Sequence, residues 1–289
     1  MSRTRPLGDT GMDITPLGFG TWVIAGSGWQ YSWGATDDAE SIAAVRHAVD
    51  SGLNWLDTAP AYGLGHAETL VGKALADMPE AERPYLFTKT GLIWEEGDDR
   101  TGPPRRITRP ETIRAELEAS LRRLRVEHID LYQVHWPDTG AVFVYGGEGA
   151  GLAAPTPLEE YWRVMADLEK EGKVRAIGLL TGAFTADRKL TADDWRSGRP
   201  DFTTGLSANL ALVDALRPIA ARHGVSVAEV ALAWVNSWPG VTAAIVGART
   251  STQIDGWTGA LTLELSPADL EEIATAINST GAGTGPARP

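Results

Sequence analysis

The sequence predicts an α/β protein built on a parallel sheet, most simply a (β/α) barrel of the TIM type. Short apolar runs that end in polar residues alternate with longer stretches of helical period. Five consecutive βα units follow one another at this spacing, which favours parallel strands joined by helices. The chain has 289 residues, of which 43% are hydrophobic, enough for one barrel domain with a packed core.

Six segments have the length and apolar content of buried strands. They are residues 17–23, 53–59, 85–90, 129–136, 174–180 and 241–248. A closed barrel of this type has eight strands, so the sequence predicts an incomplete barrel with six.

Helices are expected between these strands, and several have start or stop signals. Gly52 follows the first helix, Pro110 precedes the third, and capping boxes are expected at Thr156–Glu159 and at Ser226–Glu229. The expected helices are 37–50, 67–76, 111–125, about 157–172, 206–223, 226–238, 253–260 and 267–277.

One domain is expected over residues 1–278, with a disordered tail at 279–289. Residues 181–205 contain no strand of ordinary length and at most a short helix at 191–195. The domain is therefore expected to be shortened internally near residues 178–205.

Composition excludes several classes of protein. The formal net charge of −12 argues against a nucleic acid or an acidic membrane as partner. The chain has no cysteine, which removes disulfides, iron–sulfur clusters and thiol nucleophiles. Its five histidines form no HxH or HExxH motif, so no metal site is expected. With no signal peptide or long apolar run in evidence, a cytoplasmic protein is expected.

Four residues at successive strand ends point to proton transfer. They are Asp57, Tyr62 in the loop that follows, Lys89 and His135. A tyrosine hydroxyl titrates near pH 10, and a neighbouring ammonium anchored by a carboxylate lowers that value. A nearby histidine orients a substrate oxygen or relays a proton. Such a group would protonate the alkoxide that forms when hydride reaches a carbonyl carbon.

Each of these residues also has a structural alternative. Asp57 beside Thr58 could cap a helix, Lys89 could be a solvated charge, and His135 beside Trp136 could be a hydrogen-bonded core histidine. Their ordered placement on successive strand ends favours the functional interpretation.

The chain resembles the aldo-keto reductase family. LGFGTW at 17–22, NWLDTAPAYG at 54–63, FTKTG at 87–91 and QVHWPD at 133–138 resemble its signature segments, in order. The resemblance implies that Tyr62 is the general acid, that Lys89 and Asp57 tune it, and that His135 orients the substrate. It also implies an oxidoreductase that uses a nicotinamide cofactor to reduce aldehydes or ketones.

The same resemblance supplies candidate cofactor residues. Gly20, Thr21 and Trp22, together with Asp57, match the segment under the nicotinamide. VGARTSTQ at 246–253 resembles the loop that holds the adenosine 2′-phosphate, with the candidate residues Gly247, Arg249 and Gln253. An arginine that forks onto a phosphate favours NADPH over NADH. Trp257 stands where many members have asparagine, and helix packing is the alternative role for it.

An aromatic wall is expected beside the site. Trp29, Trp94 and Trp136 follow strand ends and would favour an apolar or aromatic carbonyl substrate, with a surface loop that buries its own aromatics as the alternative. Residues 138–155 are expected to form a substrate loop over the same end of the strands.

The chain departs from the family pattern after Gly178. There AIG continues directly into LLTGAF, a segment that resembles one found later in the family, so the resemblance implies that about two βα units are absent. Such a loss would leave strand edges open, and a partner chain in a homo-oligomer would cover them. The alternative function is therefore a cofactor-binding or inactive paralogue without turnover.

Overall fold

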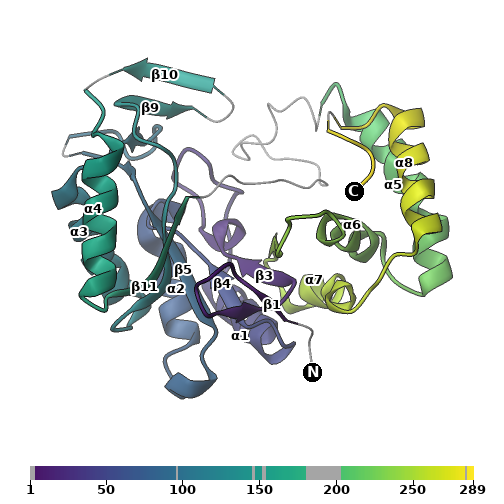
Figure 1. Ribbon diagram of the computed structural model, residues 1–289, viewed down its shortest axis with the longest axis horizontal. Helices are drawn as coiled ribbons and strands as arrows, with labels where there is room; N and C mark the ends of the chain where they lie inside the picture. Colours follow the sequence, from purple (N-terminus) through teal and green to yellow (C-terminus); the bar gives the residue numbers. More distant parts are fainter. Residues whose placement is uncertain (1–3, 96, 145–146, 152–153, 180–202, 284) are drawn as a thin grey trace.

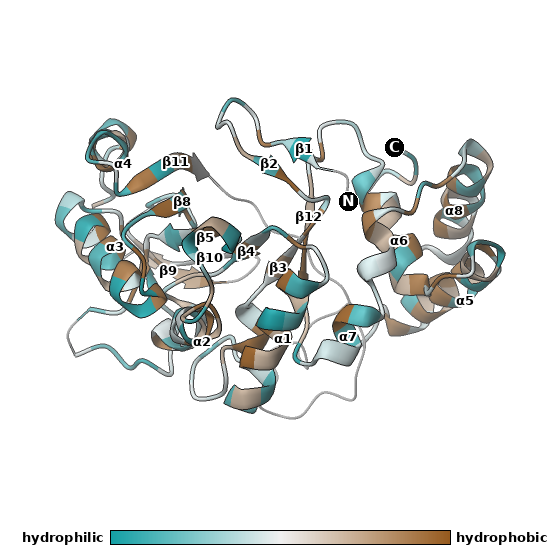
Figure 2. Ribbon diagram, turned by 90° about the horizontal axis from the view of Figure 1, so that it is seen from below, coloured by the Kyte–Doolittle hydropathy of each residue, from teal (hydrophilic) through white to brown (hydrophobic). Residues whose placement is uncertain are grey.

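Six parallel strands form the centre of the molecule. The computed structural model describes residues 4–95, 97–144, 147–151, 154–179, 203–283 and 285–289. In space the strands follow the order β11-β8-β5-β4-β3-β12 (Figure 1 and Figure 2, the latter with all six labelled). They are β3 (Leu17–Gly20), β4 (Trp55–Asp57), β5 (Tyr85–Thr90), β8 (Ile129–Val134), β11 (Val174–Leu179) and β12 (Ala244–Gly247). Every neighbouring pair is parallel, so the predicted class of fold and all six strands are confirmed. In the described residues β11 and β12 are the outer strands.

The helices lie where the periodicity predicts them, except that the helix expected at 253–260 is replaced by a shorter helix at Ser251–Asp255 and a 3-10 turn at Thr258–Leu261. They are α1 (Asp38–Asp50), α2 (His66–Ala74), α3 (Pro110–Leu124), α4 (Leu158–Lys170), α5 (Leu206–His223), α6 (Val227–Asn236), α7 (Ser251–Asp255) and α8 (Pro267–Thr280). Both teal and brown residues occur along these helices in Figure 2, as expected where one face of a helix packs on the sheet. The predicted short helix at 191–195 lies outside the described residues.

Two predicted capping boxes have different outcomes. Ser226 accepts a hydrogen bond from the Glu229 backbone N–H, and the Glu229 carboxylate accepts one from Ser226, so this box is confirmed. The box expected at Thr156 is wrong, because α4 begins after Pro157 and no side chain caps it. The backbone N–H of Thr156 instead donates to the Asp138 carboxylate, 3.2 Å away, which ties the start of α4 to the end of β8.

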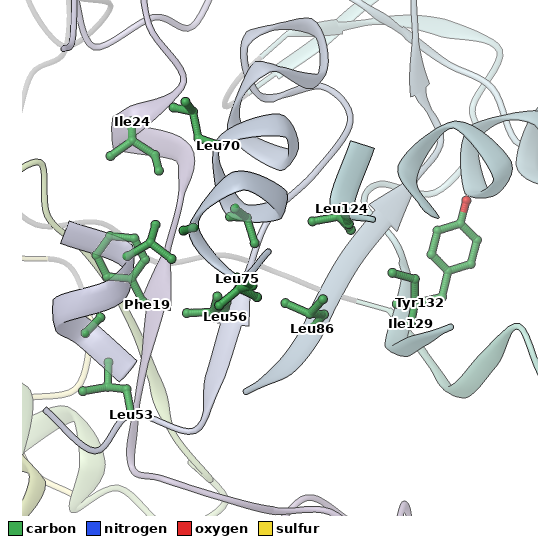
Figure 3. Packing of buried hydrophobic residues seen from close by; sticks show 14 of the residues in the cluster. Phe19, Ile24, Leu53, Leu56, Leu70, Leu75, Leu86, Leu124, Ile129 and Tyr132 are labelled. Carbon is green, nitrogen blue, oxygen red and sulfur yellow. The ribbon is translucent and has the colours of Figure 1, made fainter. Parts of the chain in front are cut away.

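The main hydrophobic core fills the space between the outer face of the sheet and α1 to α4. Phe19, Leu56 and Leu86 from neighbouring strands meet Leu75 and Leu124 from the helices (Figure 3). All five side chains are buried. Burying side chains of this kind contributes about 1.5–3 kcal/mol each, so this layer fixes the strands whose ends carry the site.

A two-stranded hairpin that periodicity does not reveal packs against the opposite face of the sheet. It consists of β1 (Arg5–Pro6) and β2 (Asp13–Ile14). Ile14 joins a second core cluster with Trp55, Phe87 and Ala176, which lie on β4, β5 and β11. Strands of two residues are too short to give a period-two pattern, so the sequence does not predict them.

The loops after β5 and β8 combine into a second, antiparallel sheet. Its strands are β6 (Leu92–Ile93), β7 (Arg105–Arg106), β9 (Ala141–Val144) and β10 (Gly147–Gly151), in the order β10-β9-β7-β6. The stretch expected to be a substrate loop at 138–155 therefore contributes a strand pair, which Figure 1 shows at one end of the central sheet.

The C-terminal helices have their own core. Leu216 and Ile219 of α5 pack with Val230 of α6 and Ile273 of α8. Helix α8 continues to Thr280, past residue 279 where the tail is expected to begin, and Arg288 forms an ion pair with Glu271, 2.5 Å away.

Substitution of Gly18 by alanine should strongly destabilise the fold. A Cβ atom at position 18 of β3 would lie 2.1 Å from the Trp55 indole ring. Overpacking of a filled core costs about 1–3 kcal/mol, and we expect Gly18→Ala to lower the free energy of unfolding by about that much. Urea denaturation measures it. Gly151→Ala in β10 is the control, because a Cβ atom there meets nothing within 4 Å among the residues that the structure describes; equal losses from both variants would contradict the prediction.

Candidate active site

Three of the four predicted catalytic residues lie at or just beyond the carboxyl ends of neighbouring parallel strands. Asp57 is the last residue of β4, Lys89 lies one residue before the end of β5, and His135 follows β8 directly. Tyr62 lies in the short loop that joins β4 to α2. Because β4, β5 and β8 are adjacent in the sheet, the structure brings these residues together.

Lys89 and Asp57 form a buried ion pair. The Lys89 ammonium donates to Asp57 Oδ1 at 2.6 Å and to the Thr58 carbonyl at 2.7 Å. Lys89 is 2% exposed and Asp57 3% exposed. Burial alone would lower the pKa of Lys89, but the charge of Asp57, the Tyr62 phenol and hydrogen bonds to both raise that pKa above its ordinary value. Lys89 therefore remains a cation at neutral pH.

Tyr62 lies against this cation. Its ring centroid is 4.9 Å from the Lys89 Nζ atom. The Trp22 ring stacks on the Tyr62 ring with centroids 5.9 Å apart and planes at 11°. Gly63 follows with a φ of +61°, and a Cβ atom there would lie 2.1 Å from the Ala25 carbonyl oxygen. Only glycine fits that turn, which fixes where the Tyr62 side chain emerges.

His135 completes the group of four. Its ring centroid lies 5.6 Å from that of Tyr62 at an interplanar angle of 79°. Its backbone N–H donates to the Thr90 carbonyl at 2.9 Å, next to Lys89 in β5. Burial and the charge of Lys89 hold the pKa of His135 well below its ordinary value. The imidazole is therefore neutral at pH 7 and can donate one hydrogen bond to a substrate oxygen.

Gln133 is a polar residue of the site that the sequence reasoning missed. Its side-chain amide nitrogen lies 3.4 Å from Asp57 Oδ2, on the side of the carboxylate away from Lys89. Gln133 stands two residues before His135, so both side chains project from the same face of β8. That alternation is the signal that could have found it.

Two of the residues predicted to hold the cofactor, Gly20 and Gly247, are glycines that lie side by side in neighbouring strands. Gly20 of β3 pairs with Gly247 of β12, and a Cβ atom on either would meet Ile245 or Val23 within 3 Å. Packing alone therefore explains both glycines.

Thr21 is different, because its hydroxyl oxygen is buried and no group in the described part of the chain hydrogen-bonds to it. A buried hydroxyl of this kind is suited to a bound polar group. The Thr21 backbone N–H donates to the Asp57 carbonyl at 2.9 Å, which holds Thr21 next to Asp57.

Arg249 and Gln253 lie together at a cavity of about 230 Å³. Ser41 and Thr250 line the same cavity, and the acidic residues Asp37 and Glu40 lie on its α1 side. The Gln253 side chain accepts a hydrogen bond from the Arg249 backbone N–H at 2.7 Å, and the Arg249 guanidinium donates to the Trp33 carbonyl. Trp257 instead packs in the main core, in agreement with the structural alternative for that residue.

The predicted aromatic wall is only partly assembled as expected. Trp94 and Trp136 pack with Phe143 of β9, and the Trp136 and Phe143 ring centroids are 5.1 Å apart. Trp29 is buried behind Tyr62 against Ala67, so it supports the tyrosine. The sequence reasoning missed Phe143, because nothing in the loop pattern shows that β9 folds back over this end of the sheet.

None of the helices described is both long enough and apolar enough to cross a membrane. Among the same residues, no group of three or more histidine and acidic side chains is placed to hold a metal ion.

Comparison with known proteins places this site in a family. Residues 16–181 and 177–278 match the aldo/keto reductase family. The chain belongs to that family. It is 30% identical over 338 residues to the aldo-keto reductase YhdN of Bacillus subtilis (strain 168), covering 95% of this chain and 93% of YhdN. It is 36% identical over 179 residues to the NADH-specific methylglyoxal reductase of Escherichia coli (strain K12), covering 60% of this chain and half of that protein.

Solved structures share the fold. The glycerol dehydrogenase AKR11B4 from Gluconobacter oxydans is 28% identical with a TM-score of 0.79, covering 98% of this chain and 97% of that one. An aldo/keto reductase from Klebsiella pneumoniae, in complex with NADP and acetate, is 23% identical with a TM-score of 0.65 and covers 99% and 98%.

These matches bear on the predicted deletion after Gly178. They extend over nearly the full length of the relatives, so they give no evidence of a deletion and do not confirm that two βα units are absent. The count of six parallel strands in the described residues is confirmed. The two family matches overlap at 177–181, where the sequence departs from the expected order of segments.

Removal of the Asp57 charge should destabilise the fold. Asp57→Asn leaves the Lys89 ammonium buried without its counter-ion, and breaking a buried pair from one side costs about 3–5 kcal/mol. We expect a loss of that size in the free energy of unfolding measured with urea at pH 7. The control is Asp38→Asn, which removes a half-exposed partner of His66 and should cost less than about 1 kcal/mol. A loss for Asp57→Asn no larger than for the control would contradict the pairing.

Proposed function

We propose that this chain is an NADPH-dependent reductase of aldehydes or ketones, with Tyr62 as the acid that protonates the carbonyl oxygen. The observation that carries the proposal is the buried Lys89–Asp57 pair held against the Tyr62 ring. A cation fixed beside a phenol stabilises the phenolate, so it makes the phenol a stronger acid. Membership of the aldo/keto reductase family supports the reaction class.

Each side chain then has one task. When bound, NADPH supplies the hydride for the carbonyl carbon. Tyr62 gives its phenolic proton to the oxygen on which negative charge develops, and Lys89 stabilises the phenolate that remains. Neutral His135 donates a hydrogen bond that orients the same oxygen. Asp57, steadied by Gln133, keeps Lys89 in place and charged.

The residues present fit a phosphorylated nicotinamide cofactor. The buried Thr21 hydroxyl has no hydrogen-bond partner among the described residues and lies beside Asp57, where the nicotinamide end would be held. Arg249 and Gln253 line a cavity at the end of β12, where the adenosine end would lie. A guanidinium suits a 2′-phosphate, which supports NADPH over NADH. An aldo-keto reductase structure from Klebsiella pneumoniae is described in complex with NADPH.

The rings beside His135 support an apolar or aromatic carbonyl compound as substrate. Trp94, Trp136 and Phe143 pack together, and Tyr31 donates from its hydroxyl to the Phe143 carbonyl at 3.0 Å. This contact joins the second sheet to the loop after β3. Apolar walls with a few placed polar groups are typical of small-molecule sites.

A second candidate is a protein that binds the cofactor without turnover. It is favoured by the six strands of the described sheet, because a closed barrel of this type has eight. The two candidates differ in one measurement, the consumption of NADPH over a broad panel of carbonyl compounds. Saturable binding without consumption would support the second candidate and contradict the first.

Tyr62→Phe should abolish turnover and spare cofactor binding. The ring and its contacts remain, but the proton donor is lost, so we expect kcat to fall by about 10²–10⁴-fold. The Kd for NADPH, measured by quenching of tryptophan fluorescence, should stay within about twofold because binding does not use the hydroxyl proton. The control is Tyr85→Phe on β5, outside the site. Substantial residual turnover in Tyr62→Phe would contradict the role of Tyr62.

Arg249→Met should weaken NADPH more than NADH. Loss of one charge-assisted hydrogen bond to a phosphate costs about 1.5–3 kcal/mol, so the Kd for NADPH should rise about tenfold or more while that for NADH changes little. Fluorescence titration with both cofactors measures this. Arg46→Met serves as the matched control, because Arg46 lies on α1 outside the cavity and pairs with Asp77. Equal weakening of both cofactors would contradict recognition of the 2′-phosphate by Arg249.

A further inference from the structure

Charged side chains form hydrogen bonds with strand β5 on the face opposite the site. Thr88 and Thr90 flank Lys89, and because side chains alternate along a strand they project away from the ion pair. The Thr88 hydroxyl donates to Glu68 Oε1 at 2.6 Å, and the Thr90 hydroxyl donates to Glu116 Oε2 at 2.6 Å. The carboxylates come from α2 and α3, so two helices hold the strand on either side of Lys89.

The first carboxylate also links β5 to the Tyr62 loop. Glu68 is fully buried, and its second oxygen accepts from Arg123 at 2.6 Å. The Arg123 side chain lies against Gly65, where a Cβ atom would come within 2.7 Å of Arg123 Cδ and Nε. Gly65 ends the turn that begins at Tyr62 and has a φ of +92°. Arg123 therefore supports the Tyr62 loop and the Lys89 strand together.

The second carboxylate reaches His135 through the backbone. Glu116 Oε2 accepts from the Thr90 hydroxyl and from the Gly91 backbone N–H at 3.1 Å. The carbonyl of that same Thr90 accepts from the His135 backbone N–H. Glu116 thus fixes the end of β5 to which His135 is attached.

We propose that Glu68, Arg123 and Glu116 are positioning residues that set the relative placement of Tyr62, Lys89 and His135 from behind the sheet. This inference rests on the proposed function for the roles of those three groups. The positioning residues touch no substrate and act through Thr88, Thr90, Gly91 and the turn at Gly65. Misplacement of reacting groups by about 1 Å can cost 10²-fold in rate, so such support has a measurable consequence.

Because Glu116 can ionise, the strength of its hydrogen bonds to β5, and with it the placement of Lys89 and His135, should depend on pH. The groups that face Glu116 are Glu68 from α2, Arg123 of its own helix, Tyr132 from β8, and Thr90 with Gly91 from β5. Burial and the charge of Glu68 raise the pKa of Glu116 to about 7, against the opposing effect of its hydrogen bonds and of Arg123. Above that pH the carboxylate accepts charge-assisted hydrogen bonds, which are stronger than those to a neutral acid. The hydrogen bonds from Thr90 and Gly91 to Glu116 therefore strengthen as pH rises through 7. His135 is already neutral in this range.

The first test is the pH profile of Glu116→Gln. This variant keeps an oxygen acceptor for Thr90 and Gly91 but cannot ionise. In wild-type protein we expect kcat for carbonyl reduction to rise about threefold to tenfold through pH 7. The variant should lack this step and remain at the lower value, with little change in KM for NADPH. The matched control Glu118→Gln, on the same helix but paired with Lys173 at the surface, should keep the wild-type profile. A step that persists unchanged in Glu116→Gln would overturn the proposal.

The second test does not depend on turnover. Thr90→Val removes the hydroxyl that holds Glu116 and changes no charge, so we expect Lys89 to lie less closely against Tyr62. The ionisation of Tyr62, followed as the ultraviolet difference between each protein and its Tyr62→Phe version, should shift upward by about one pH unit or less. Thr112→Val is the control, since that hydroxyl donates only to the Arg109 carbonyl. An unshifted Tyr62 titration in folded Thr90→Val would overturn the proposal.

The two tests also separate this inference from the proposed function. If wild-type protein reduces no carbonyl compound, the proposed function fails, and the Tyr62 titration still decides the positioning role. If turnover is normal and neither Glu116→Gln nor Thr90→Val has an effect, the positioning role fails alone. A further comparison uses Arg123→Met, which removes the charge beside Glu68, and Arg123→Lys, which keeps it. A Tyr62 ionisation in Arg123→Lys that lies closer to wild type than in Arg123→Met supports the role of that charge.

Discussion

The contact on which the site depends is the ion pair between Lys89 and Asp57. Bringing two charges out of water costs several kcal/mol for each, and their attraction offsets this only when the remaining hydrogen-bonding positions are also filled. Here the Thr58 carbonyl accepts a second hydrogen bond from the Lys89 ammonium, and the Gln133 amide lies against the other carboxylate oxygen. Because each partner needs the other, β4 and β5 must keep one register, and Tyr62 is then presented to a cation whose position is fixed.

The alternation of side chains in β5 explains why the environment of this strand is unusually polar. With Lys89 directed to the site, Thr88 and Thr90 must face the helices, where an apolar core would leave two hydroxyl groups without partners. Glu68 and Glu116 supply acceptors, and their negative charges in turn require Arg123. Lys89 on one face of β5 is thus accompanied by the charged residues Glu68, Glu116 and Arg123 on the other face. The need for a lysine in the site therefore also determines which residues pack behind the strand.

The sequence predicts what depends on regular periodicity and on motifs, and it fails where short elements are fixed by tertiary contacts. All six strands, the eight helices of the described residues and the meeting of Tyr62, Lys89 and His135 at one end of the sheet follow from apolar spacing and strand order. The hairpin of β1 and β2 does not, because strands of two residues carry no period. The second sheet does not either, because its strands come from two separate loops and pair only in the folded protein. Thr156 was misassigned as a helix cap since Asp138, distant in sequence, competes for its backbone N–H. Glu68 and Glu116 have the spacing of ordinary helix residues, and only the packing of α2 and α3 on β5 reveals their partners.

The proposed proton-transfer residues do not depend on the outer strands of the sheet. Asp57, Lys89 and His135 belong to β4, β5 and the end of β8, which are adjacent and covered by α2 and α3. The opposite situation holds at β12, where Ile245 is 43% exposed although the residue it pairs with, Gly18, lies in the buried strand β3. The loop with Arg249 follows β12, and it is joined to the rest of the site by the pairing of β12 with β3 and by the hydrogen bond from Arg249 to the Trp33 carbonyl. The proposed acid at Tyr62 and the proposed phosphate-binding residue Arg249 therefore stand on different strands, and the contact of the Trp33 and Trp22 rings with the stacking of Trp22 on Tyr62 connects them.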